Sequence, residues 1–258
     1  MIRPRTACWM GVAALVLAPL VAVGGELHVT EAAAYTGTYG LQVQITDGTG
    51  AWVEDDHPGG TVRYRARVYV NTDALTLPAG GSAPILVAYD GGGQPVTWLE
   101  LAENGGGVEV LGSSVDGTGT SSAGPVTLPA GWHAVELAWI GGAGDGSLEL
   151  DLDGVTAATV ANLDTGGVLV SSVRLGAPDG VPGGATGSLV FDCFDSSPYA
   201  ALGLAGDADG NGTVDSNDLP ALASGLGGAT LLPPGADVNC DGDFDAADLS
   251  ALIRFLQQ

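Results

Sequence analysis

Apolar and polar residues alternate along most of the chain between about residues 26 and 195. An alternation with a period of two predicts β-strands that bury one face, because successive side chains of a strand point to opposite sides. Asn-Gly and Asp-Gly pairs between the runs are typical of tight turns. Together these features predict an antiparallel β-sandwich with one sizeable core. The clearest strands are expected at residues 39–46, 61–71, 83–89, 96–102, 107–111, 133–140, 148–153 and 188–194.

The pattern changes after residue 206, where apolar residues recur at helical spacing in two places. Pro220 stands in the first turn of the first predicted helix, where its missing N–H removes no hydrogen bond. Gly227 and Gly228 provide a stop. The C-terminal region is therefore expected to hold two short helices, with apolar faces formed by Leu219, Leu222 and Leu226, and by Leu249, Leu252, Ile253 and Leu256.

A twelve-residue acidic pattern leads into each predicted helix, beginning at Asp207 and, thirty positions later, at Asp237. A calcium loop supplies oxygen ligands from positions 1, 3, 5, 7, 9 and 12, with Gly at position 6. Both copies meet this pattern, with Asp in place of the usual Glu at position 12. The alternative is a pair of acidic surface turns. This alternative is disfavoured because both copies place the same kinds of residue at the same positions. Two calcium ions are thus expected, one held by Asp207, Asp209, Asn211, Asp215, Asp218 and the carbonyl of Thr213, the other by Asp237, Asn239, Asp241, Asp245, Asp248 and the carbonyl of Asp243.

No long helix is predicted before either loop, so each unit is a calcium loop followed by its exiting helix. In this arrangement residues 206–258 resemble a dockerin. The resemblance implies a module folded by calcium that binds a cohesin domain on another protein. Well-studied dockerins carry small hydroxyl residues at loop positions 10 and 11, where this chain has Ser216-Asn217 and Ala246-Ala247. Val214 and Phe244, at position 8, are expected to be buried between the paired loops.

Three segments of the predicted sandwich resemble laminin G-like and concanavalin A-like jelly rolls. Residues 131–137 and 148–154 resemble their paired central strands, and residues 187–192 resemble their last strand. The resemblance implies a mainly β jelly roll, followed here by a small α-helical dockerin-like module. It also implies recognition of a carbohydrate or a protein by the sandwich.

Some relatives of that fold are glycoside hydrolases with two glutamates on one strand. The nearest match is Glu149-Leu-Asp151-Leu-Asp153, in which Asp153 opens an Asp-Gly turn. Two nearby carboxylates can hydrolyse a glycosidic bond, but a solvated strand face explains this stretch better. The sequence also contains no nucleophile elbow, zinc-binding His-Glu-x-x-His motif or phosphate loop. The chain is therefore predicted not to be an enzyme, with an extracellular glycosidase and a purely structural surface protein as the alternatives.

The first residues have the pattern of a secretory signal peptide. Arg3 and Arg5 precede an apolar run from about residue 12 to residue 23, which is too short to cross a bilayer comfortably. A secreted or cell-surface protein is expected, with no membrane insertion after cleavage. The predicted organisation is a signal peptide over 1–24, a sandwich over 25–195, a linker over 196–205 and the module over 206–258.

The charge balance is strongly acidic, with 30 Asp and Glu residues against 7 arginines, no lysine and a net charge of −23. Such a chain repels nucleic acids and anionic membranes and attracts divalent cations. Arg63, Arg65 and Arg67 alternate along one strand. They are expected to pair across strands with Glu100, Glu136 or Glu149; the alternative is a patch for an acidic polysaccharide.

Two further groups of residues leave alternatives open. Cys193 and Cys240 could form a disulfide in an oxidising compartment, or Cys240, at position 4 of the second loop, could be free. Seven aromatic residues belong mostly to the predicted core but could include a platform for stacking sugars. They are Trp52, Trp98, Trp132, Trp139, Tyr64, Tyr69 and Tyr89.

Overall fold

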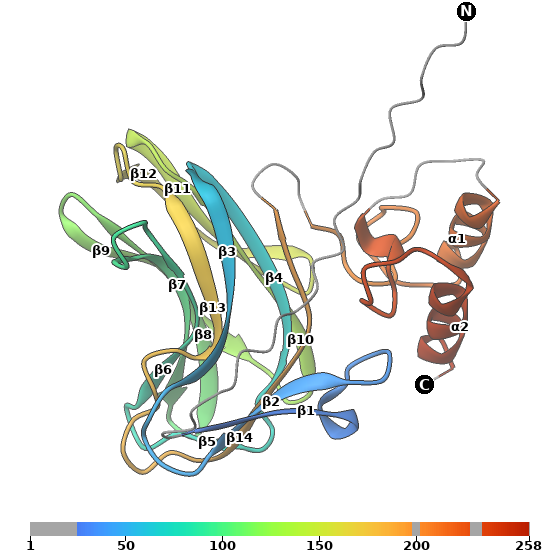
Figure 1. Ribbon diagram of the computed structural model, residues 1–258, viewed down its shortest axis with the longest axis horizontal. Coiled ribbons are helices and arrows are strands. Elements are labelled where there is room, and N and C mark those ends of the chain that lie inside the picture. Colours follow the sequence, from blue (N-terminus) through green and yellow to red (C-terminus); the bar gives the residue numbers. More distant parts are fainter. Residues whose placement is uncertain (1–24, 198–201, 228–233, 258) are drawn as a thin grey trace, which may run out of the picture.

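The computed structural model describes residues 25–197, 202–227 and 234–257. Two antiparallel sheets face each other, and a small helical module lies beside one of them (Figure 1). The predicted signal peptide and part of the predicted linker lie outside the described residues. The strands are β1 Glu26–Thr30, β2 Gly40–Ile45, β3 Ala51–Thr61, β4 Arg63–Asn71, β5 Leu75–Thr76, β6 Ser82–Tyr89, β7 Pro95–Asn104, β8 Gly107–Asp116, β9 Gly119–Leu128, β10 Trp132–Ile140, β11 Ala143–Leu152, β12 Val155–Asp164, β13 Val170–Ala177 and β14 Thr186–Ser197.

The larger sheet has eight strands, in the order β1-β2-β14-β4-β10-β11-β12, with β5 paired to β14. The smaller sheet has six strands, in the order β3-β13-β6-β7-β8-β9. In both sheets strands distant in sequence are neighbours: β14 lies between β2 and β4, and β13 lies between β3 and β6. This crossed connectivity confirms the predicted jelly-roll type of sandwich.

The core lies between the two sheets and is built from the inward face of each alternating run. Tyr64, Leu137, Trp139 and Leu148 are fully buried there. The indole N–H of Trp139 donates to the hydroxyl of Ser114 at 3.1 Å, so the largest core side chain has its polar atom satisfied. Burial of these side chains is the main force that holds the two sheets together.

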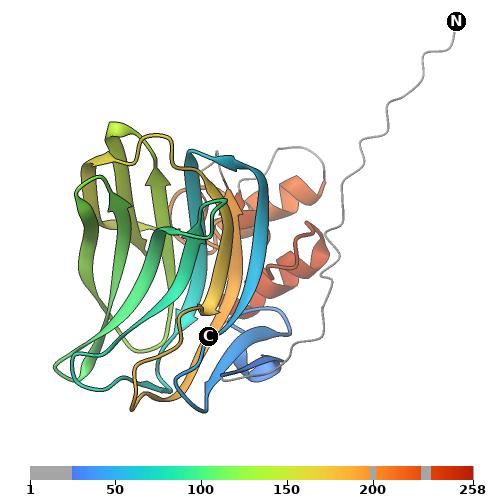
Figure 2. The same ribbon diagram turned by 60° about the vertical axis from the view of Figure 1, so that its left-hand side comes forward.

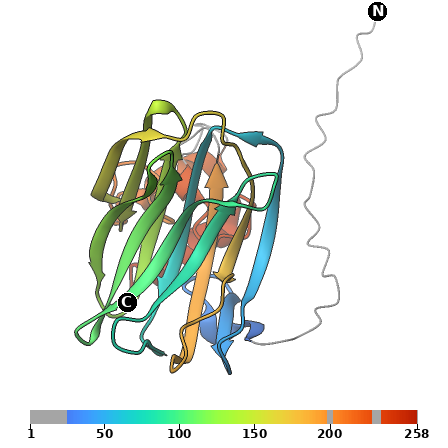
Figure 3. The same cartoon turned by 90° about the vertical axis from the view of Figure 1, so that its left-hand side faces the viewer.

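The module contains helices α1 Asp218–Leu226 and α2 Ala246–Phe255, and two short 3-10 turns complete the chain at η1 Glu31–Ala33 and η2 Pro234–Ala236. Leu222 of α1 and Leu252 of α2 are fully buried in a small core of their own. The module packs on the outer face of the eight-stranded sheet (Figures 1 and 2). Figure 3, which looks onto the six-stranded sheet, shows the module behind the sandwich, so the outer face of the smaller sheet is left uncovered by it.

Candidate metal centre

The first acidic loop folds around its own side chains. Asp207 accepts backbone N–H groups of Asn211 and Gly212, both at 2.9 Å. Asp218 accepts the N–H of Asp209 at 3.0 Å with one oxygen and that of Asp215 at 2.7 Å with the other. One carboxylate oxygen from each of Asp207, Asp209 and Asp218 lies within 4.8 Å of the others. The loop therefore brings three negative charges together around one point.

The second loop repeats the same bonding pattern. Asp237 accepts the N–H groups of Asp241 and Gly242 at 3.2 and 2.9 Å. Asp248 accepts the N–H of Val238 at 2.8 Å and that of Asp245 at 2.9 Å. Burial raises the pKa of the Asp237 carboxyl. The two loops are thus two copies of one local structure, as their sequences predict.

The aspartate at position 12 is the centre of each loop. Asp218 is the first residue of α1, and Asp248 lies in the first turn of α2. Both side chains are nevertheless fully buried. In α2, Asp245 and Asp248 form a capping box with the backbone at the helix start. Asp218 therefore closes the first loop and faces Asp207 and Asp209, and Asp248 closes the second loop and caps the start of α2.

The donor set fits calcium. Oxygen atoms from carboxylates and an amide are the ligands that a hard divalent cation prefers, and three converging carboxylates repel one another unless a cation balances them. The twelve predicted ligands, including the carbonyls of Thr213 and Asp243, stay a prediction, as does the number of ions. Val214 packs against the module core, whereas Phe244 is 38% exposed instead of buried between the loops.

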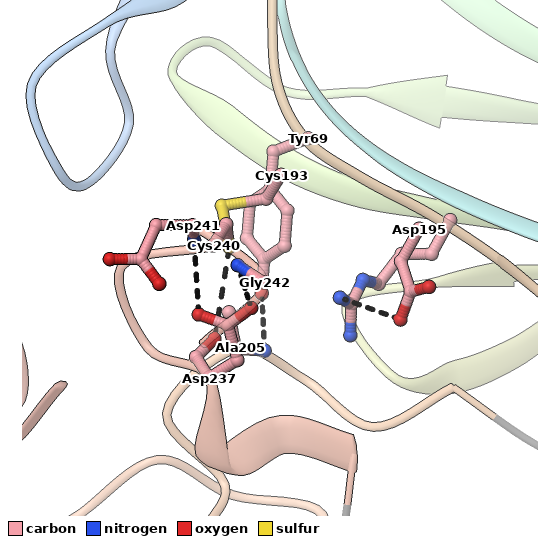
Figure 4. A network of polar contacts seen from close by, with 9 residues as sticks. Tyr69, Cys193, Asp195, Ala205, Asp237, Cys240, Asp241 and Gly242 are labelled. Atoms are coloured by element: carbon pink, nitrogen blue, oxygen red, sulfur yellow. Dashed lines mark hydrogen bonds and ion pairs between the residues drawn. A yellow bond between two sulfur atoms is a disulfide. The ribbon is translucent and has the colours of Figure 1, made fainter. Parts of the chain in front are cut away.

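A disulfide joins the second loop to the sandwich. Cys193 of β14 is bonded to Cys240, with the two Cα atoms 5.2 Å apart (Figure 4). Beside this disulfide the Tyr69 hydroxyl accepts the N–H of Ala205 at 3.1 Å. Tyr35 stacks on Tyr69 with the ring centroids 4.3 Å apart. Of the two alternatives for these cysteines, the structure shows the bridge, and with it a fixed junction between sandwich and module.

Two arginines of β4, Arg65 and Arg67, take part in ion pairs on the face that the module partly covers. Arg65 Nη1 lies 2.8 Å from Glu136 Oε1, which confirms the predicted cross-strand pairing. Burial raises the pKa of the Glu136 carboxyl, and the hydrogen bond and charge of Arg65 oppose that rise. Arg67 is 4% exposed, and its Nη2 lies 3.7 Å from Asp195 at a cavity of about 180 Å³ against the second loop. Of the three arginines, Arg67 is therefore buried at the junction, whereas Arg63 is exposed.

Asp153, the last carboxylate of the Glu149-Asp151-Asp153 stretch, is held by polar contacts to the neighbouring strand. Asp153 accepts the N–H of Ala134 at 2.9 Å, and its other oxygen lies 2.8 Å from His133 Nδ1. Asp153 has a positive φ of 52° at the Asp-Gly turn, where the sequence predicts a turn. Its role is to fix the turn between β11 and β12.

The uncovered face of the six-stranded sheet carries a second group of polar and aromatic side chains. Arg174 of β13 stands over the rings of Trp52 and Tyr89, with its guanidinium carbon 4.8 and 4.7 Å from the two ring centroids. Its Nε donates to Glu54 at 2.7 Å. The register places Trp98, whose indole N–H donates to Glu100 at 3.4 Å, on the same face. Sequence reasoning missed Arg174, because a lone arginine in a strand has no local signature.

The architecture defines a class of protein: an antiparallel β-sandwich followed by a duplicated calcium loop-helix module. Residues 205–257 match the dockerin type I domain family. The C-terminal module is accordingly a dockerin type I domain, and the β-sandwich precedes it. No curated protein matches the chain. No helix within the described ranges is long and apolar enough to cross a membrane.

Solved structures similar to the chain include two lyases and a cellulose-induced protein. An endo-β-1,4-glucuronan lyase from the fungus Trichoderma reesei is 17% identical with a TM-score of 0.47, covering 69% of this chain and 91% of its own. The cellulose-induced protein Cip1 is 16% identical with a TM-score of 0.46, covering 69% and 88%. The alginate lyase PA1167 from Pseudomonas aeruginosa is 16% identical with a TM-score of 0.38, covering 62% and 73%. At these low identities the similarity concerns the fold alone.

The prediction that the chain is not an enzyme is wrong. It compared the sandwich with hydrolase motifs and with a few other catalytic motifs, whereas structures of this fold include glucuronan and alginate lyases. The similarity in fold assigns no reaction and no catalytic residue to this chain.

Proposed function

We propose that the chain is an exported protein that docks onto a cohesin-bearing partner through its dockerin domain and carries its β-sandwich to that partner as cargo. The observation that supports docking is the pair of acidic loops, each closed by a buried aspartate that also begins a helix. The strongly acidic composition and the disulfide suit an extracellular setting.

Calcium would be held by the carboxylate and amide oxygens of the two loops, where it neutralises side chains that otherwise repel one another. Asp207 and Asp237 order the loop backbone, and Asp218 and Asp248 join each loop to its helix. The arrangement converts calcium binding into a fixed orientation of α1 and α2. Docking is therefore expected to require calcium.

The test is a calorimetric calcium titration of the full chain, followed by pull-down with immobilised type I cohesin domains in calcium and in chelator. Binding of two ions and retention by a cohesin in calcium alone would support the proposal. The paired variant Asp218→Asn and Asp248→Asn should lose both, whereas Asp116→Asn, in the distant β8–β9 hairpin, should lose neither. Retention by cohesin with equal strength in chelator would contradict calcium-dependent docking.

A second proposal concerns the uncovered face of the six-stranded sheet, which has the chemistry of a polysaccharide-binding surface. Trp52 is 36% exposed, and aromatic faces of this kind stack against the C–H side of a sugar ring. Arg174 can donate to sugar hydroxyls, and Glu54 and Glu100 can accept from them. A polysaccharide laid across β3, β13, β6 and β7 would meet all of these groups.

This second proposal is tested with soluble neutral polysaccharides and polyuronates, measuring retardation in affinity electrophoresis. Trp52→Ala and Trp98→Ala should abolish the retardation, and Trp132→Ala, which alters an aromatic residue at the domain junction, should preserve it. The same incubations are followed for new unsaturated or reducing chain ends, which report catalysis directly. Equal retardation of all three variants would remove this face as the binding surface.

A further inference from the structure

The two repeats of the dockerin domain are not equivalent in this chain, because the sandwich holds the second one. Cys240 of the second loop is covalently bonded to Cys193. The Tyr35 ring lies 6.0 Å from that of Phe255 in α2. Gly37 approaches the second loop so closely that a Cβ there would lie 2.9 Å from the carbonyl oxygen of Asn239. These contacts come from β14 and from the turn between η1 and β2.

That turn forms one wall of a groove along α2. The groove has a volume of about 440 Å³, and it is lined by Tyr35 to Thr38 on one side and by Ala247, Ser250 and Arg254 on the other. A space of this size admits a few side chains or a small ligand. A folded partner buries about 800 Å² of each surface in a stable complex. The sandwich therefore prevents a flat protein surface from reaching this face of α2.

The corresponding face of the first repeat lies open. Ser216, Asn217, Ala223 and Ser224 are exposed. The only charged residue of α1 is Asp218, which is fully buried. The exposed face of α1 thus carries no charged side chain, although the chain has a net charge of −23. A partner can bind this face without desolvating a charged group and without charge repulsion from it. Its small side chains allow close contact with the helix.

We infer that the partner domain binds the first repeat, over Ser216, Asn217 and the exposed side of α1, and that the second repeat is reserved for packing against the sandwich. This inference rests on the proposed docking function. The occupant is a folded cohesin-type domain with a neutral surface that presents hydrogen-bonding groups to Ser216, Asn217 and Ser224. Recognition would then be single-faced, with one orientation of the partner.

The test uses the full oxidised chain with calcium and a matched pair of serine variants, Ser224→Arg on α1 and Ser250→Arg in the α2 groove. Both serines are exposed, so each substitution adds the same bulk and charge. Affinity for an immobilised type I cohesin is expected to fall about thirtyfold or more in Ser224→Arg, as for a central interface residue. In Ser250→Arg it should stay within about twofold of the wild-type value.

Ala223→Arg provides a second variant on α1, and helical circular dichroism with calcium binding checks that each variant is folded. The inference is overturned if Ser250→Arg loses affinity, or if folded Ser224→Arg and Ala223→Arg both keep it. If the wild-type chain binds no cohesin while retaining two calcium ions, the proposed docking function itself fails. The two failures are therefore told apart by the wild-type measurement.

Discussion

Removing the disulfide is expected to destabilise the dockerin domain by about 4 kcal/mol. The double substitution Cys193→Ser and Cys240→Ser opens a covalent loop that spans a sequence separation of 47 residues. Closing a loop of that length lowers the entropy of the unfolded chain, which stabilises the folded state by about 4 kcal/mol at room temperature. Serine is close to cysteine in size, so the folded junction should change little.

The assay is urea unfolding in saturating calcium, followed by helical circular dichroism. With a urea dependence of about 1–3 kcal/mol per molar, the loss corresponds to a fall of at least about 1 M in the midpoint of the helical transition. Wild-type protein in reductant should behave like the double variant. An unchanged midpoint in the variant, with wild type shown by mass spectrometry to be bridged, would refute the chain-entropy reasoning.

Three further outcomes are expected. Chelating calcium should abolish the helical signal and expose residues 206–258 to protease while the sandwich stays protected, and equal protection of the module with and without chelator would contradict this. The hydrogen bond from the Ser121 hydroxyl, together with those from Thr118, lowers the pKa of the Asp116 carboxyl to about 2. Because the lowered pKa stabilises the fold above the ordinary value of 3.8, that contribution is lost as the pH falls towards 2. Ser121→Ala should move the Asp116 titration seen by NMR upward, and an unmoved midpoint would exclude this hydrogen bond as the main cause. Leu148→Ala should cost about 2–5 kcal/mol of sandwich stability because the side chain is fully buried, which thermal unfolding measures, and a loss below about 1 kcal/mol would show that the core collapses into the cavity.

The loops could be predicted from the sequence because their geometry is local. The hydrogen bonds that the Asp207 and Asp218 carboxylates accept all come from residues within the twelve of the first loop, so the spacing of the sequence carries this information. The exposure of Phe244 could not be predicted in the same way. Whether position 8 is covered depends on how the two repeats pack, and only Val214 packs against the module core.

The sandwich was predictable in class, whereas several of its strands were not. Strand β9 is rich in Gly, Ser and Thr, and β12 at the edge of its sheet is rich in Ala and Thr, so neither shows a strong alternation of apolar residues. The group of side chains on the uncovered face could not be predicted either. Trp52, Tyr89 and Arg174 come from three strands that become neighbours only in the folded chain. The disulfide joins distant residues in the same manner, and sequence left it as one of two alternatives.

The position of the disulfide has a mechanical consequence. Cys193 lies in β14, at the irregular step between its paired residues Asp192 and Asp195, and β14 is hydrogen-bonded to β2 on one side and to β4 on the other. A pull exerted through a docked partner would reach β14 by two covalent routes, the peptide chain that follows the strand and this disulfide. The force would then be shared along two ladders of hydrogen bonds inside the larger sheet, so that the cargo resists being torn from its anchor.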